Sequence, residues 1–174
     1  MTSAARIVLS DCRLALNEFK NALEQSTFET IRIRWLTCLT LLRAVGHVLQ
    51  KVDEAKYNSN EKEKAKNLHG LRKKDKIFEQ FIEAERNLML KQYKHHLKYD
   101  EKIKKEGGDY LCTEDGTRLV TESGDFLITE TKEWIQKNIT KIDGHKKDYK
   151  PDEIIQEAIE WWEKELDKAD KISN

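Results

Sequence analysis

The sequence predicts a mainly α-helical protein: an antiparallel helical bundle of about five main helices with a small inserted three-stranded antiparallel β meander. Three observations predict this class. Apolar residues recur at alternating steps of three and four over long segments, which is the spacing of a helix with one buried face. The 174 residues include one proline and seven glycines, so few positions interrupt a helix. An eight-residue repeat at 111–130 carries the turn residues of β hairpins.

The first two expected helices carry the clearest apolar stripes. Over residues 4–24 the stripe consists of Leu9, Cys12, Leu16, Phe19 and Leu23. Ser26 followed by Glu29 fits a capping box, which predicts the start of a second helix. The second stripe extends over about four heptads and consists of Phe28, Ile31, Trp35, Cys38, Leu42, Val45, Leu49 and Val52. We expect the second helix to form the centre of the fold.

Residues 54–76 are almost entirely polar, so we interpret them as an exposed connection with at most a short helix after Asn60. A third helix is expected from about 74 to 105, ended by Gly107-Gly108. Its expected buried residues are Phe78, Phe81, Ile82, Met89, Leu90, Tyr93 and Leu97.

Two further helices are expected after the repeat. The first starts near Thr131 and ends about Asp143-Gly144. Pro151 suits the first turn of the second, and the acidic Asp152 that follows it complements the positive end of the helix dipole. We expect this last helix to reach about Lys171.

The repeat itself predicts three strands, which we place at 109–130 as an insertion in a single helical domain of residues 1–174. Its copies are Leu111-Cys112-Thr113-Glu114, Leu119-Val120-Thr121-Glu122 and Leu127-Ile128-Thr129-Glu130. Asp115-Gly116 and Ser123-Gly124 follow the first two copies. Glycine accepts the positive φ that a two-residue hairpin turn requires. The expected structure is an antiparallel meander.

Two-residue turns make both faces of this meander partly apolar. One face would hold Tyr110, Cys112, Leu119, Phe126 and Ile128, and the other Leu111, Val120 and Leu127. A half-exposed sheet is apolar on one face only. We therefore expect the meander either to be sandwiched within the chain or to contact a second subunit or a protein partner.

Composition excludes several classes of function. The 32 basic and 32 acidic side chains cancel, whereas a surface that binds nucleic-acid phosphates usually leaves a domain net positive. Three scattered cysteines without C-x-x-C spacing predict neither a disulfide framework nor a zinc site. No segment approaches the ~18 consecutive apolar residues of a membrane span, and the common enzyme motifs are absent. We expect a cytoplasmic protein without membrane contact or cofactor.

A metal site is also considered at His96 and Asp100, which are four residues apart and would share a helix face. No third ligand lies nearby in the sequence. We therefore interpret these residues and His95 as solvent-exposed, and expect no metal.

Arg86 is the most informative polar residue. At 100° per residue it falls inside the apolar stripe of the expected third helix. A guanidinium there either packs its stem and pairs with a carboxylate such as Glu79 or Glu83, or faces a cleft.

The segment Glu85-Arg86-Asn87-Leu88-Met89-Leu90-Lys91-Gln92-Tyr93 resembles the motif of the HEPN superfamily (higher eukaryotes and prokaryotes nucleotide-binding). That motif has an arginine, often followed by asparagine, then a histidine about four to six residues later; one branch adds a tyrosine. Arg86, Asn87 and Tyr93 match, but Lys91 and its neighbours occupy the histidine positions. The resemblance implies a helical body in which arginine and histidine from two subunits meet at a dimer cleft and cleave RNA without a metal.

Two hypotheses of function follow. The first is a non-enzymatic interaction or regulatory protein with a HEPN-like helical body, which forms a homodimer and binds a protein partner through the meander. We favour it because the histidine is missing and lysine is a poor general base near neutral pH. The alternative is a HEPN-like RNA-binding protein or endoribonuclease of a toxin or phage-defence system, acting through Arg86 at a dimer cleft with Asn87, Lys91 and Tyr93.

Overall fold

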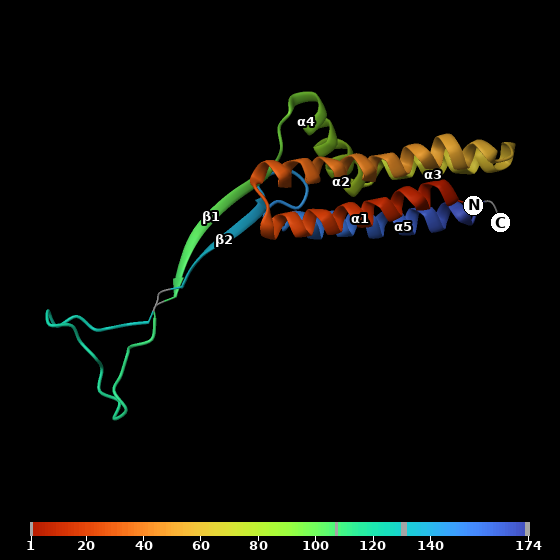
Figure 1. The fold of residues 1–174 in the computed structure, drawn as a ribbon. Helices are drawn as coiled ribbons and strands as arrows, with labels where there is room; N and C mark the ends of the chain where they lie inside the picture. Colours follow the sequence, from red (N-terminus) through yellow and green to blue (C-terminus); the bar gives the residue numbers. More distant parts are fainter. Residues whose placement is uncertain (1, 107, 130–131, 173–174) are drawn as a thin grey trace. The chain divides into compact units, whose positions relative to one another are not determined.

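A computed structural model describes residues 2–106, 108–129 and 132–172, and Figure 1 shows their elements. The chain divides into two compact units. The first, which we call the helical unit, combines Met1–Tyr99 with Ile139–Asn174. The second, which we call the hairpin unit, is Asp100–Asn138.

Three long helices form most of the core of the helical unit: α1 (Ser3–Gln25), α2 (Phe28–Val48) and α5 (Pro151–Asp170). Helix α1 packs against both α2 and α5 (Figure 1). These helices confirm the first, second and last helices that the sequence predicts. The buried stripe residues of α1 and α2 include Leu9, Cys12, Leu16, Phe19, Ile31, Trp35, Cys38, Leu42 and Val45.

The start of α2 differs slightly from the prediction. Its N-cap is Thr27 and not Ser26, and Thr27 makes no side-chain cap hydrogen bond. Later in α2, Gly46 lies where two helices approach closely. A Cβ at this position would lie 2.7 Å from the Trp162 ring of α5, so only glycine fits there without a shift.

Helix α2 continues into the π-helix η1 (Leu49–Asp53). A π-turn contains more residues than an α-turn, so it rotates the following side chains relative to the α-helical stripe. Val52, predicted to be buried, is 44% exposed, whereas Asp53 is 1% exposed. The Asp53 carboxylate accepts hydrogen bonds from the Ala4 N–H (3.2 Å) and the Ala5 N–H (2.9 Å) at the start of α1.

The predicted exposed connection at 54–76 is mostly helical. It contains the 3-10 helix η2 (Glu54–Lys56) and α3 (Ser59–Lys74). A capping box starts α3: the Asn58 side chain accepts from the Glu61 N–H at 2.9 Å, and the Asn58 N–H donates to the Glu61 carboxylate at 2.7 Å. The polar segment therefore forms a helix in which side chains of the first turn accept hydrogen bonds from backbone N–H groups at its start.

A buried arginine attaches α3 to the rest of the unit. Arg72 Nε lies 3.1 Å from Glu165 Oε2 of α5, and Arg72 Nη1 lies 3.5 Å from Glu54 Oε1. All three side chains are buried. Burial raises the pKa of Glu54, although the Arg72 charge opposes this. A buried guanidinium requires such carboxylate partners.

The expected third helix is wrong in its second half. The π-helix η3 (Ile77–Glu83) leads into α4 (Ala84–Gln92), which ends at Tyr93 in the left-handed conformation with φ 52°. The chain then forms strand β1 (Leu97–Glu106).

The expected fourth helix is also wrong, because the chain forms strand β2 (Lys132–Lys141) there. The two strands pair as a small antiparallel sheet. The pairing joins segments far apart in sequence, and local periodicity carries no information about it. The predicted boundaries at Gly107 and Thr131 lie outside the described residues.

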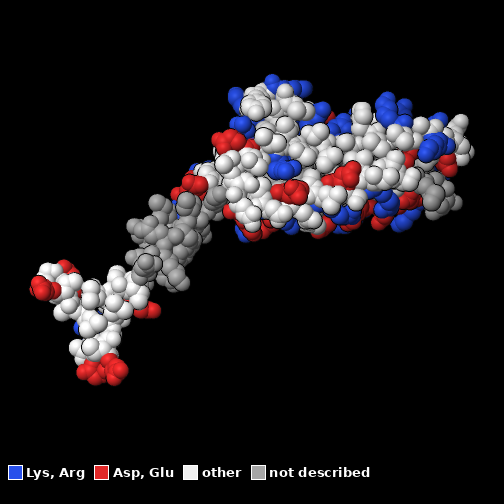
Figure 2. Space-filling model, viewed as in Figure 1, with Lys and Arg blue, Asp and Glu red and all other residues white. Residues whose placement is uncertain are grey.

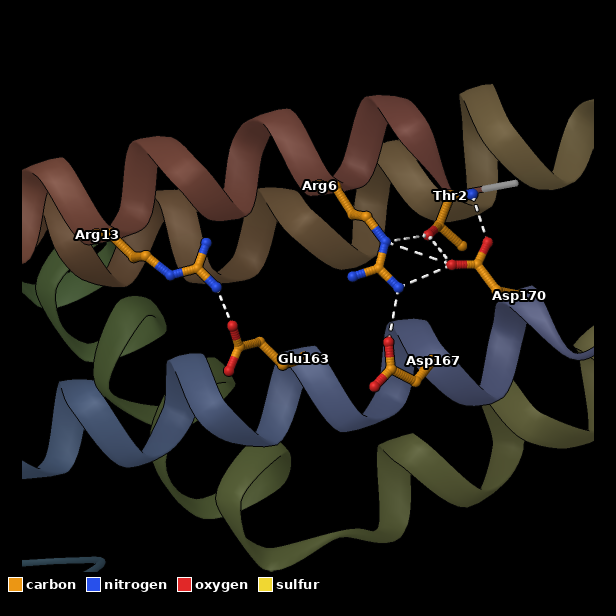
Figure 3. A network of polar contacts seen from close by, with 6 residues as sticks. All are labelled: Thr2, Arg6, Arg13, Glu163, Asp167 and Asp170. Atoms are coloured by element: carbon orange, nitrogen blue, oxygen red, sulfur yellow. Dashed lines mark hydrogen bonds and ion pairs between the residues drawn. The ribbon is translucent and has the colours of Figure 1, made fainter.

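A polar network with mostly exposed ion pairs joins α1 to α5 near the chain ends (Figure 3). The Arg6 guanidinium lies 2.7 Å from both Asp167 Oδ1 and Asp170 Oδ2. The Thr2 N–H donates to Asp170 Oδ1 at 2.8 Å, and Arg13 pairs with Glu163. Exposed pairs contribute little stability, so this network mainly sets the alignment of two helices that the core already holds.

Candidate interaction site

The three repeat copies form a closed ring of backbone hydrogen bonds. The Leu111 N–H donates to the Leu127 carbonyl at 2.9 Å, the Leu119 N–H to the Leu111 carbonyl at 2.8 Å, and the Leu127 N–H to the Leu119 carbonyl at 2.9 Å. Each leucine thus donates to one copy and accepts from the other. We call residues 109–129 the repeat ring.

The structure does not confirm an open three-stranded meander. The ring has isolated antiparallel bridges, which are Tyr110–Ile128, Cys112–Arg118 and Val120–Phe126. In a meander the first and third strands do not pair, but here Tyr110, directly before the first copy, bridges Ile128 of the third. The repeat therefore has approximate threefold symmetry.

Three-residue loops, and not the predicted two-residue turns, connect the copies. The Thr113 N–H donates to the Thr117 carbonyl at 2.8 Å, and the Gly116 N–H to the Thr113 carbonyl at 2.9 Å. Gly116 has φ 85° and Gly124 has φ 88°, as expected for the left-handed residue that ends such a loop. The extra loop residue shifts the pairing by one position.

This shift corrects the predicted faces. Bridge partners share a face and neighbours in a strand alternate, so Leu119 lies with Leu111 and Leu127, and Val120 lies on the opposite face. We call the three leucines the leucine face. The opposite face, which we call the mixed face, holds Tyr110, Cys112, Arg118, Val120, Phe126 and Ile128.

The apolar side chains of both faces are exposed. Leu111, Leu119 and Leu127 are 41%, 38% and 37% exposed. On the mixed face, the Arg118 guanidinium lies 4.1 Å from the centre of the Tyr110 ring and 5.7 Å from that of Phe126. The ring thus has an ordered backbone without a core that buries its side chains.

Carboxylates surround the repeat ring. Figure 2 shows acidic side chains at the ends of its loops, where Glu114, Asp115, Glu122 and Asp125 are exposed. The Thr113 hydroxyl donates to Asp115, and the Thr117 N–H donates to the same Asp115 oxygen at 3.1 Å. These hydrogen bonds, that of the Thr113 hydroxyl first, lower the pKa of Asp115.

The HEPN-like candidates lie on or beside α4, and Arg86 is not at the centre of its buried stripe. Leu90 and Tyr93 are exposed, and Leu97 belongs to β1. The buried stripe therefore consists of Phe81, Ile82 and Met89. Glu85, and not Arg86, lies at the centre of this stripe. Arg86 is half-buried, and its Nη1 donates to Asn87 Oδ1 at 3.0 Å.

The other two candidates point to solvent. Lys91 and Tyr93 are both exposed, and the Arg32 guanidinium lies 5.0 Å from the centre of the Tyr93 ring. Within the described residues, no hydrogen bond, ion pair or ring contact links Arg86 to Lys91 or Tyr93. One chain therefore does not gather these four residues into a site.

The structure instead reveals a buried charged cluster that the sequence interpretation missed. Glu85 and Lys141 are 1% and 0% exposed. Glu85 Oε1 lies 2.8 Å from Lys141 Nζ and 2.9 Å from His96 Nδ1. Lys141 Nζ also donates to the Asp143 carbonyl. The position of Glu85 in the α4 stripe is the sequence signal that could have indicated a buried carboxylate.

Gly144 lies next to this cluster and has a left-handed backbone conformation, with φ 74°. A Cβ there would lie 2.9 Å from Lys141 Nζ and 3.4 Å from Glu85 Oε1. His96, which the sequence considers as a metal ligand, thus contacts Glu85. Among the described residues, no group of three or more His, Cys, Asp or Glu side chains could hold a metal ion.

In the part of the chain that the structure describes, the helices are too short or too polar to cross a membrane. Comparison with protein-family models, curated proteins and solved structures finds no match to this chain. The repeat ring and the charged cluster are therefore interpreted from their own geometry.

Proposed function

We propose that this chain is a non-enzymatic interaction protein that binds a protein partner through its repeat ring. The observation that carries the proposal is the exposure of the leucine face, on a backbone closed by hydrogen bonds between Leu111, Leu119 and Leu127. Contiguous exposed apolar surface on a folded protein is typical of an interaction site.

The repeat ring also has two features of a binding surface in the unbound state, which are an ordered backbone and exposed aromatic and arginine side chains. Its closed hydrogen bonds order the backbone, so binding would require little further loss of conformational entropy. The mixed face presents Tyr110, Phe126 and Arg118 together, and aromatic and arginine side chains are the residues that most often dominate binding energy. A homodimer, as the sequence predicts, is one possible form of this interaction.

The proposal is tested by photo-crosslinking in the native host. A photoreactive phenylalanine analogue replaces Leu119 in the ring or, as a matched control, Leu14, which is 62% exposed on α1. We expect a discrete protein adduct from position 119 only, and its loss when Leu111→Ser and Leu127→Ser are added. Circular dichroism checks that the helices persist. The same adducts from both positions, or none from 119, would contradict the proposal.

A further inference from the structure

We propose that the partner of the repeat ring is a protein surface in which lysine and arginine side chains surround an apolar centre. This inference rests on the docking function proposed above. It follows from the charge of the ring, from the placement of its one cation and from the apolar character of the leucine face.

The repeat ring is strongly acidic although the whole chain is neutral. Residues 109–129 contain five carboxylates and one arginine, a net charge of −4, whereas the chain has a formal net charge of zero. The carboxylates are Asp109, Glu114, Asp115, Glu122 and Asp125. The ring therefore attracts positive charge.

Most of this negative charge is not neutralised within the ring. Arg118 lies over the Tyr110 and Phe126 rings of the mixed face. Within the described residues, Glu114 and Glu122 make no ion pair, and both are exposed. Hydrogen bonds lower the pKa of Asp115, so this carboxylate remains ionised at neutral pH.

The same charge disfavours other occupants. Nucleic-acid phosphates and anionic lipid headgroups would be repelled by the loop carboxylates, and a second repeat ring would place like charges face to face. A purely charged partner would leave Leu111, Leu119 and Leu127 in water. A basic surface with an apolar centre satisfies both the leucines and the carboxylates.

The test uses the full chain and three labelled synthetic peptides of equal length: alternating Leu and Lys, alternating Leu and Glu, and alternating Ser and Lys. Fluorescence anisotropy measures binding. We expect the Leu–Lys peptide to bind at least about tenfold more tightly than either other peptide. Added salt should weaken this binding, since exposed charges are screened.

Substitutions in the repeat ring test whether the peptide binds there. Leu119→Ser, and the pair Glu114→Gln with Glu122→Gln, should each weaken binding of the Leu–Lys peptide by about tenfold. The matched controls on α1 are Leu14→Ser and Asp11→Asn with Glu24→Gln, which change exposed residues of the same types. These controls should leave binding unchanged.

Three outcomes would overturn the inference: equal weakening by the α1 controls, equal binding of the Leu–Glu peptide, or a dimer in sedimentation that Leu119→Ser dissociates. The last result would make a second copy the occupant and leave the docking function standing. Absence of adducts at position 119 in the crosslinking experiment would instead remove the docking function itself. The two failures are therefore distinguishable.

Discussion

Glu85 and Lys141 show how a single buried pair joins the end of a strand to a helix. Glu85 comes from α4 and Lys141 from the end of β2, and one carboxylate oxygen contacts both Lys141 and His96. Transfer of either charge out of water is costly, and the pair is stable only because each charge compensates the other.

We expect Lys141→Met to lower the free energy of unfolding by about 3–5 kcal/mol, because it leaves the Glu85 carboxylate buried without its main cation. Urea denaturation at neutral pH measures the change. Glu85→Leu combined with Lys141→Met should lose clearly less stability than Lys141→Met alone, since no buried charge remains. If Lys141→Met were as stable as the wild type, this would contradict the burial of the pair.

Arg86 provides a separate test of the RNA-directed alternative. We expect Arg86→Ala to change neither binding nor cleavage of mixed RNA, because the guanidinium donates to Asn87 and the motif lacks its histidine. Gel analysis with purified protein measures both, and Lys94→Ala provides a control at an exposed cation after α4. Cleavage or tight binding that is lost only in Arg86→Ala would favour the HEPN-like alternative.

At the scale of elements, the spacing of apolar residues is sufficient to predict a helix where the segment packs as a regular α-helix. It predicts α1, α2 and α5, and most of the buried residues of α1 and α2, because the sum of many stripe positions outweighs local exceptions. It fails at residues 97–106 and 132–141, which are both rich in Lys but form strands. Their pairing partner lies in a distant segment, and tertiary pairing overrides helix propensity there.

The remaining errors concern the position of residues around a helix, and a π-helix explains the first of them. Val52 and Asp53 exchange their expected burial at η1. Glu85 replaces Arg86 at the centre of the α4 stripe, which the sequence placed too far round the helix by including exposed Tyr93. An α-helical period cannot reveal a π-turn such as η1, because packing in the folded protein stabilises it.

The loops of the repeat ring make a prediction about pH. Asp115 accepts from the Thr113 hydroxyl and the Thr117 N–H, and these bonds lower its pKa below the ordinary value of 3.8. The ionised carboxylate therefore stabilises the loop above pH 3.8, and this contribution is lost as the pH falls through the lowered pKa.

NMR can follow this titration at the Thr117 amide. We expect its chemical shift to change with an apparent pKa below 3.8, and Asp115→Asn to abolish the change. A titration at or above 3.8 would show that the loop hydrogen bonds do not persist in solution.

At the scale of the whole molecule, the sequence predicts where the repeat ring lies better than how it is built. The period of eight residues locates the repeat and indicates that both of its faces are partly apolar. The three-residue loops at Gly116 and Gly124 decide which residues share a face, and the sequence allows either loop length. The charged cluster at Glu85 could not be predicted, because Lys141 lies 56 positions later in the chain.

The stability of the helical unit should fall as the pH is lowered below neutrality. Burial lowers the pKa of His95 and of His145 below the ordinary value of 6.5. The unfolded chain therefore binds protons more readily than the folded one as the pH falls through 6.5, which favours unfolding. Glu54 acts in the opposite direction, because burial raises its pKa above 4.5.

Urea denaturation at about pH 7 and about pH 5.5 tests this linkage. We expect a lower midpoint at the more acidic pH in the wild type, and a smaller difference when His95→Gln and His145→Gln are combined. His47→Gln is the matched control, because its side chain is exposed on α2 and its replacement should leave the difference unchanged. Equal midpoints at the two pH values in the wild type would contradict the lowered pKa of these two half-buried imidazoles. An undiminished difference in the double variant would assign the pH dependence to other groups.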